Sequence, residues 1–124
     1  MEALLWIYII NATLLIVHEI DSAYWHEWKL FKLPGGIGGF LLIHIPLVLL
    51  ILFGLVQLCH AGPQSLIFSL FLSAAGFLAF ILHMTFLARG GKEFREPVSI
   101  SILIAIMVVS FLQTGLTVYL LANG

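Results

Sequence analysis

The sequence predicts an all-α fold: a bundle of four transmembrane helices that forms a single domain over residues 1–124. Two observations support this prediction. The chain has 124 residues, of which 62% are hydrophobic and only 9% are charged, which is too little charge to cover a soluble domain of this size. The hydrophobic residues also fall into four segments of about 20 residues, the length that an α-helix needs to cross about 30 Å of hydrocarbon.

The four segments are separated by loops with clear turn chemistry. Pro34 and four glycines follow the first segment, a short Gly-Pro turn follows the second, and a charged loop ending at Pro97 follows the third. In lipid the segments must be helical, because an isolated strand would leave backbone groups without hydrogen bonds. The first has no basic stretch before it, so we expect a retained helix rather than a cleaved signal peptide. The expected helices cover about residues 3–25, 40–59, 65–88 and 98–121.

The basic residues predict the orientation of the bundle. All five lysines and arginines fall in the first and third loops, and none lies in the second loop or at the C-terminal end. The positive-inside rule then places these two loops in the cytoplasm and both termini outside (N-out/C-out). The chain has no basic tail or stripe, so we expect the lipid bilayer as its surroundings and no nucleic-acid partner. The basic residues are Lys29, Lys32, Arg89, Lys92 and Arg95.

Ionisable residues occur inside the predicted helices, where each costs ~2.5–3.5 kcal/mol near the bilayer centre. The first helix carries His18, Glu19 and Asp21, and the second and third carry His44 and His83. Counted from the loops at about 1.5 Å per residue, all of them lie in the cytoplasmic half of the bilayer. We expect His26 and Glu27, further along, to lie among the lipid head groups.

Polar and small residues also form stripes along the predicted helices, at the spacing of one helix face. Such stripes pack inward in membrane bundles, so the histidines should face one another inside the bundle. We expect Asn11 and Gln113 to form hydrogen bonds between helices. The stripes contain Asn11, His18, Ser22 and Trp25 on the first helix; Ser65, Ser69, Gly76 and His83 on the third; and Ser99, Ser110, Gln113 and Thr117 on the fourth.

Histidines and carboxylates at one depth suggest a metal site. Imidazole is a common ligand for zinc and iron, and a carboxylate often completes such sites. We therefore expect His18, His44, His83 and Asp21 to be ligands of Zn or Fe, with Asp21 or Glu19 as a catalytic base. The protein would then be a metal-dependent enzyme acting on a lipid-soluble substrate. The zincin and ferritin-like di-iron motifs are both absent.

Other functions fit the same residues. His44 and His83 could hold haem b between two imidazoles, although the carboxylates near His18 would then have no role. A chain of Asp, Glu and His could also carry protons or ions. Alternatively, the polar groups could only join the helices by hydrogen bonds. The small size of the chain also fits a non-catalytic subunit of a larger membrane complex, or a homo-oligomer.

One run of residues resembles a known family. The run from His18 to Trp28, with the sequence His-Glu-Ile-Asp-Ser-Ala-Tyr-Trp-His-Glu-Trp, is followed by Leu33-Pro34-Gly35-Gly36 and then by His44. This pattern resembles a family of small bacterial four-helix integral membrane proteins, a domain of unknown function. The resemblance implies the four-helix fold and a location in the bacterial inner (cytoplasmic) membrane. It implies no activity.

Overall fold

Four long helices and one short helix make up the protein, and there is no strand. The computed structural model describes all residues from Met1 to Gly124. Four of the helices are long and apolar enough to cross a membrane, so the chain is an integral membrane protein with the predicted four-helix fold. The helices are α1 (Glu2–Tyr24), α2 (Glu27–Leu30), α3 (Gly36–Cys59), α4 (Ser65–Ala88) and α5 (Pro97–Asn123).

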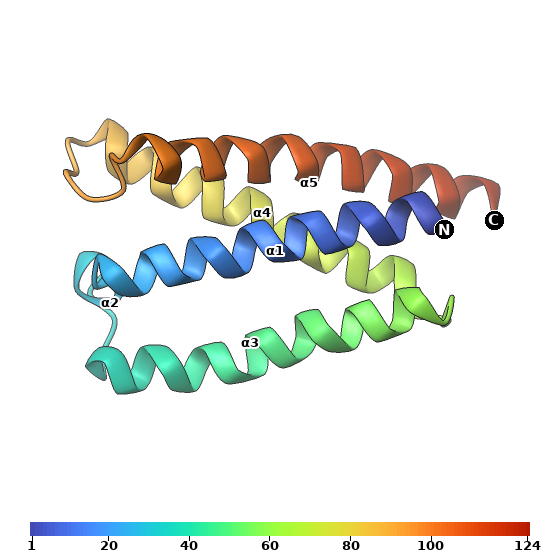
Figure 1. The fold of residues 1–124 in the computed structure, drawn as a ribbon, viewed down its shortest axis with the longest axis horizontal. Helices are drawn as coiled ribbons and strands as arrows, with labels where there is room; N and C mark the ends of the chain where they lie inside the picture. The colour runs from blue at the N-terminus through green and yellow to red at the C-terminus, as the bar shows by residue number, and fades with distance from the viewer.

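Both chain ends lie at one end of the bundle, and α2 and the α4–α5 loop lie at the other (Figure 1). The α3 helix begins at Gly36, earlier than expected, because Gly35 adopts a left-handed conformation (φ 96°) that starts the helix there. The short helix α2 was not expected from the sequence. It is entered through His26, whose backbone is also left-handed (φ 54°).

Helices α1, α4 and α5 form the closely packed part of the bundle. Small residues let α4 and α5 approach each other, as is common in membranes. Gly76 of α4 faces Ser110 and Ile106 of α5 so closely that a Cβ atom on Gly76 would overlap the Ser110 hydroxyl. The two helices can therefore pack this closely only because residue 76 has no side chain.

An amide–hydroxyl network joins these three helices inside the bundle. Asn11 of α1 donates from Nδ2 to Gln113 Oε1 (2.7 Å) and to Ser110 Oγ (3.1 Å), both on α5. Gln113 donates from Nε2 to the carbonyl oxygen of Ser69 on α4 (2.9 Å). The hydroxyls of Ser69 and Thr117 are 2.8 Å apart. The expected interhelical hydrogen bonds of Asn11 and Gln113 are thus confirmed.

Helix α3 stands apart from this packed core (Figure 1). Only Phe40, Gly54 and Leu58 of its 24 residues are buried. Near the end that carries the chain termini, the Tyr8 hydroxyl of α1 donates to the carbonyl oxygen of Ile51 (2.8 Å). Gly54 leaves room for this ring, because a Cβ atom there would overlap the Tyr8 hydroxyl.

Replacing Gly76 by Val should separate α4 from α5 and lower the thermal stability of the purified protein in detergent. The added side chain has to displace Ser110 and Ile106. Gly115→Val is the matched control, because a Cβ atom at Gly115 meets nothing within 4 Å. A thermal unfolding curve followed by circular dichroism checks this; equal midpoints for the two variants would contradict it.

Candidate functional site

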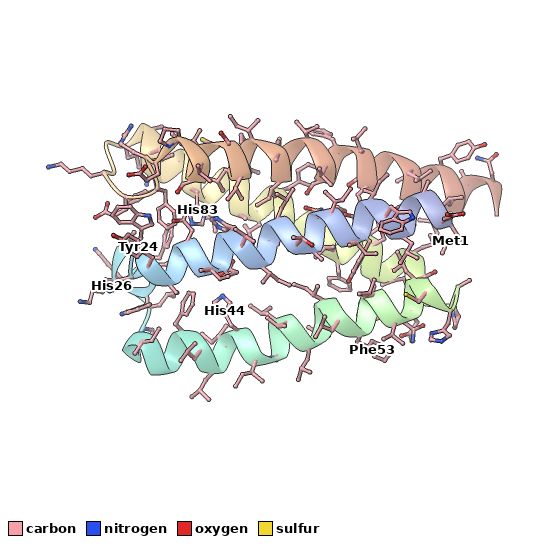
Figure 2. The ribbon with its side chains drawn as sticks, in the orientation of Figure 1. Met1, Tyr24, His26, His44, Phe53 and His83 are labelled. Atoms are coloured by element: carbon pink, nitrogen blue, oxygen red, sulfur yellow. The ribbon has the colours of Figure 1, made fainter.

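A carboxylate–imidazole pair joins α1 to α3 at the end of the bundle that holds α2. His44 Nε2 lies 2.5 Å from Glu19 Oε2. The other ring nitrogen, His44 Nδ1, lies 2.6 Å from the carbonyl oxygen of Phe40, one turn earlier in α3. Figure 2 shows the His44 ring pointing from α3 toward α1.

The geometry of this pair fixes how many protons it holds. A carbonyl oxygen only accepts hydrogen bonds, so His44 Nδ1 carries a proton and donates it to Phe40. The contact between His44 Nε2 and Glu19 then needs a second proton between the two atoms. Whether that proton resides on nitrogen or on oxygen, the pair shares one proton in addition to the one on Nδ1.

A second pair repeats this arrangement on α4. His83 Nδ1 donates to the carbonyl oxygen of Ala79, one turn earlier (2.7 Å). His83 Nε2 lies 3.3 Å from Glu27 Oε1 of α2. In both pairs, therefore, the helix's own carbonyl group fixes the tautomer and turns Nε2 toward a glutamate. The pairs differ in burial: 19% of the His44 side chain is exposed, but only 2% of the His83 side chain.

His18 lies beside the second pair, and its polar atoms have no partner. Its ring stands edge-on to that of His83, with the centroids 4.3 Å apart. The residue is 1% exposed, and neither ring nitrogen makes a hydrogen bond. A buried imidazole without partners is costly, which marks His18 as a group available to a ligand or to a proton.

An aromatic side chain from the α4–α5 loop covers these histidines. Phe94 is fully buried, with its ring 4.7 Å from that of His83 and 6.1 Å from that of His18. Its backbone is left-handed (φ 62°), which is uncommon for an aromatic residue. Arg95 holds the loop in place by donating to the carbonyl oxygens of Leu87 and Gly91. Water from the loop side is thus kept from the two rings.

Glu27 lies outside the membrane-spanning helices and is half-buried. Burial raises the pKa of this carboxyl group, but the His83 imidazole beside it, helped by Ser22 and His18, lowers the pKa by more. The pKa of Glu27 therefore lies below its ordinary value, and this carboxylate is ionised at neutral pH.

A cavity of about 680 Å³ runs between α1, α3 and α4 and reaches both pairs. Of its 23 lining residues, 18 are hydrophobic. The other five lining residues are Glu19 and Glu27 with the three histidines His18, His44 and His83. We call this cavity the α3 cleft. Tyr8 stands toward one end of it, and both Glu–His pairs stand toward the other.

The structure divides the predicted metal ligands between separate places. His18 and His83 are neighbours, but His44 pairs with Glu19 instead of joining them. The Asp21 side chain makes no hydrogen bond or ion pair, and Asp21 does not line the α3 cleft. No group of three or more His, Cys, Asp or Glu side chains is arranged to hold a metal ion.

Two residues of the site were not expected from the sequence. Glu27 was expected among the lipid head groups, yet it faces His83. The position of Phe94 was not expected either, because nothing in the sequence of a charged loop indicates that its phenylalanine is buried against two histidines. The neighbouring His26 does remain exposed at the end of the bundle (Figure 2).

The fold and the cleft together define an integral membrane protein of four spanning helices with ionisable residues inside. A family model matches residues 4–120, and its description is a family of unknown function (DUF6713). The chain belongs to this family, in agreement with the resemblance seen at His18 to Trp28. No curated protein and no solved structure matches the chain.

Proposed function

We propose that this protein binds a lipid-soluble molecule in the α3 cleft and holds its polar head beside the two Glu–His pairs. The observation that supports this is one cavity that combines a long apolar wall with Glu19 and all three histidines of the spanning helices. Its volume, about 680 Å³, lies within the range of ligand pockets, ~300–1,000 Å³.

The walls of the cleft suggest that the ligand arrives through the bilayer. Leu41 and Leu47 of α3 line the cleft and are 54% and 46% exposed. Phe71 and Leu78 of α4 share both properties. Exposed side chains along the walls of the cleft indicate that it is open to the surrounding lipid. Phe94 closes the opposite route, from the loop.

The chemistry that the site supports is proton transfer. Each Nε2 atom faces a carboxylate, and each Nδ1 proton is held by a backbone carbonyl group. A head group that reaches Glu19 or His44 meets an acid and a base within one hydrogen bond, the arrangement used in general acid–base catalysis. An enzymatic role on a lipid-soluble substrate and a proton-relay role both fit this site.

Filling the cleft with a larger side chain should weaken ligand binding. Ala75 lines the α3 cleft, whereas Ala74, beside it on α4, is exposed and lies outside the cleft. We expect Ala75→Phe to weaken binding by about tenfold or more and Ala74→Phe to leave it unchanged. The probe is 2-bromododecan-1-ol, which carries its bromine beside the head group, and the readout is quenching of Trp28, whose ring centroid lies 5.5 Å from that of the cleft residue Phe40.

Trp28 is made the sole tryptophan by replacing Trp6 and Trp25 with Phe in every variant. Protein in phosphatidylcholine nanodiscs is titrated with the probe, and the saturable part of the quenching is measured. Equal binding by the two alanine variants would show that the alcohol quenches Trp28 from the bulk lipid, and would overturn the proposal.

Metal binding remains a prediction, and the side chains as they stand do not fit it. His18 favours it, because both of its buried ring nitrogens lack partners. The separation of His44 from His18 and His83 opposes it. Elemental analysis of chelator-free protein is the check. Zinc or iron near one equivalent, lost in His18→Ala and kept in the exposed control His60→Ala, would make this a metalloprotein. Bound haem b would be detected by its visible absorption spectrum.

We also propose the N-out/C-out orientation in a bacterial cytoplasmic membrane, on the strength of the basic loops. The only cysteine, Cys59, is exposed at the end of α3 near the chain termini. It should react with a membrane-impermeant maleimide in intact bacteria. A Cys59→Ser, Glu96→Cys variant carries the thiol to the opposite end and should react only after permeabilisation. The reverse pattern would invert the orientation.

A further inference from the structure

The charges that line the α3 cleft cancel one another. Glu19 and His44 share one proton beyond the one on Nδ1, so this pair has no net charge wherever the shared proton lies. The ionised Glu27 lies 3.3 Å from His83 Nε2, where a bare nitrogen would turn its lone pair toward the carboxylate. His83 is therefore protonated on both nitrogens, and the second pair is neutral as well. No lysine or arginine lines the cleft, and no hydrogen bond stabilises a charge on His18.

A neutral cleft disfavours a charged head group, which would lose its water there and gain no counter-ion. The phosphate of an ordinary phospholipid would find no basic partner, because all five basic residues lie in the loops and none lines the cleft. A cationic head group would meet two glutamates whose charges are already balanced by histidines. An uncharged head group loses only its hydrogen bonds with water, and one good acceptor can replace them.

Glu19 provides that acceptor. Its Oε2 atom contacts His44, and the other oxygen, Oε1, has no hydrogen-bond partner in the protein. Whether the shared proton lies on His44 or on Oε2, Oε1 carries none, so it accepts a hydrogen bond in both states. The Glu19 side chain is 34% exposed, more than any other side chain of the two pairs, so a ligand can reach it.

The other end of the cleft is suited to an apolar tail. Tyr8 and Glu19 lie eleven residues apart on α1, which is about 16 Å at 1.5 Å per residue. Phe68 lines the cleft toward the Tyr8 end, where it lies beside Gly54. The Tyr8 hydroxyl already donates to the carbonyl oxygen of Ile51, so this end offers no free donor. The polar head of a ligand is therefore held at the Glu19 end alone.

We propose that the molecule bound in the α3 cleft is an amphiphile with an uncharged hydroxyl head group, which donates a hydrogen bond to Glu19 Oε1. This inference rests on the proposed function and adds the chemical class of the ligand to it. A hydroxyl group meets both requirements of the site, because it carries no charge and it has a proton to donate. The bulk phospholipids, whose phosphates are charged, meet neither.

The test compares four probes that share one tail and carry bromine on the second carbon: 2-bromododecan-1-ol, its methyl ether, 2-bromododecanoate and 2-bromododecyltrimethylammonium. Binding to the protein with Trp28 as sole tryptophan is measured by quenching in phosphatidylcholine nanodiscs at pH 7.5. Affinities are expressed as the mole fraction of probe in the bilayer, so that partitioning from water does not enter. The alcohol should bind about tenfold or more tightly than the ether, which cannot donate, and than either ion.

Replacing the pair by apolar side chains, Glu19→Met together with His44→Leu, should remove the advantage of the alcohol over the ether. Such a replacement of a buried pair by apolar residues is often neutral for stability. Glu19→Gln should lower the advantage without removing it, because an amide oxygen accepts more weakly than a carboxylate. Glu2→Gln is the control and should keep the full advantage, because Glu2 is an exposed carboxylate on the same helix.

Two sets of outcomes separate this inference from the proposed function. If the ether or either ion binds as tightly as the alcohol, or if the advantage of the alcohol survives the double substitution, the hydroxyl head group is overturned and the cleft remains a binding site. The ranking of the four probes decides this even where the double variant does not fold. No saturable binding of any probe, or equal binding of the alcohol by Ala75→Phe and Ala74→Phe, would overturn the proposed function itself.

Discussion

The contact between Glu19 and His44 is the interaction on which the shape of this molecule most depends. Helix α3 buries only three of its residues, so it gains little from packing against the bundle. Two polar contacts hold it: Tyr8 with the carbonyl group of Ile51 near one end, and Glu19 with His44 near the other. Single hydrogen bonds between membrane helices contribute ~0.6 kcal/mol on average. A charged or proton-sharing bond with neighbours of low dielectric is stronger. The cleft lies next to the Glu19–His44 bond, whereas Ile51, Leu55 and Leu58 pack against the core nearer the other end of α3.

The same constraint explains why the two Glu–His pairs look alike. A histidine in a membrane helix has two nitrogens to satisfy, and water is not at hand. The carbonyl group one turn earlier serves one nitrogen at His44 and again at His83. The second nitrogen needs a partner from another helix: Glu19 of α1 bonds to it at His44, and Glu27 of α2 lies 3.3 Å from it at His83. His18 lacks even the hydrogen bond to the backbone, so both of its ring nitrogens are left without a partner.

Much of the fold followed from the sequence because hydrocarbon permits so few alternatives. Segments of about 20 apolar residues in lipid have to be helices, and stripes such as Ser69, Gln113 and Thr117 had to face inward. Depth was also predictable, because rise per residue is fixed. Which side chain each ionisable residue would contact was not predictable. Glu19 follows His18 directly, and a step of about 100° around α1 turns the two side chains toward different helices. His18 consequently meets His83 on α4, and Glu19 meets His44 on α3. The positions of Glu27 and Phe94 were not predicted for a related reason. Both residues lie in short connecting segments whose course depends on left-handed backbone at His26 and Phe94.

A cleft whose rims face lipid is never empty in a membrane. Acyl chains of the surrounding lipid enter an open apolar cleft whenever no other molecule occupies it, so a ligand would have to displace lipid in order to bind. Its occupancy depends on its mole fraction in the bilayer and not on its concentration in water. Diluting the protein with more membrane at constant total ligand would empty the cleft, and a cell could set the occupancy simply by changing how much of the amphiphile its membrane contains.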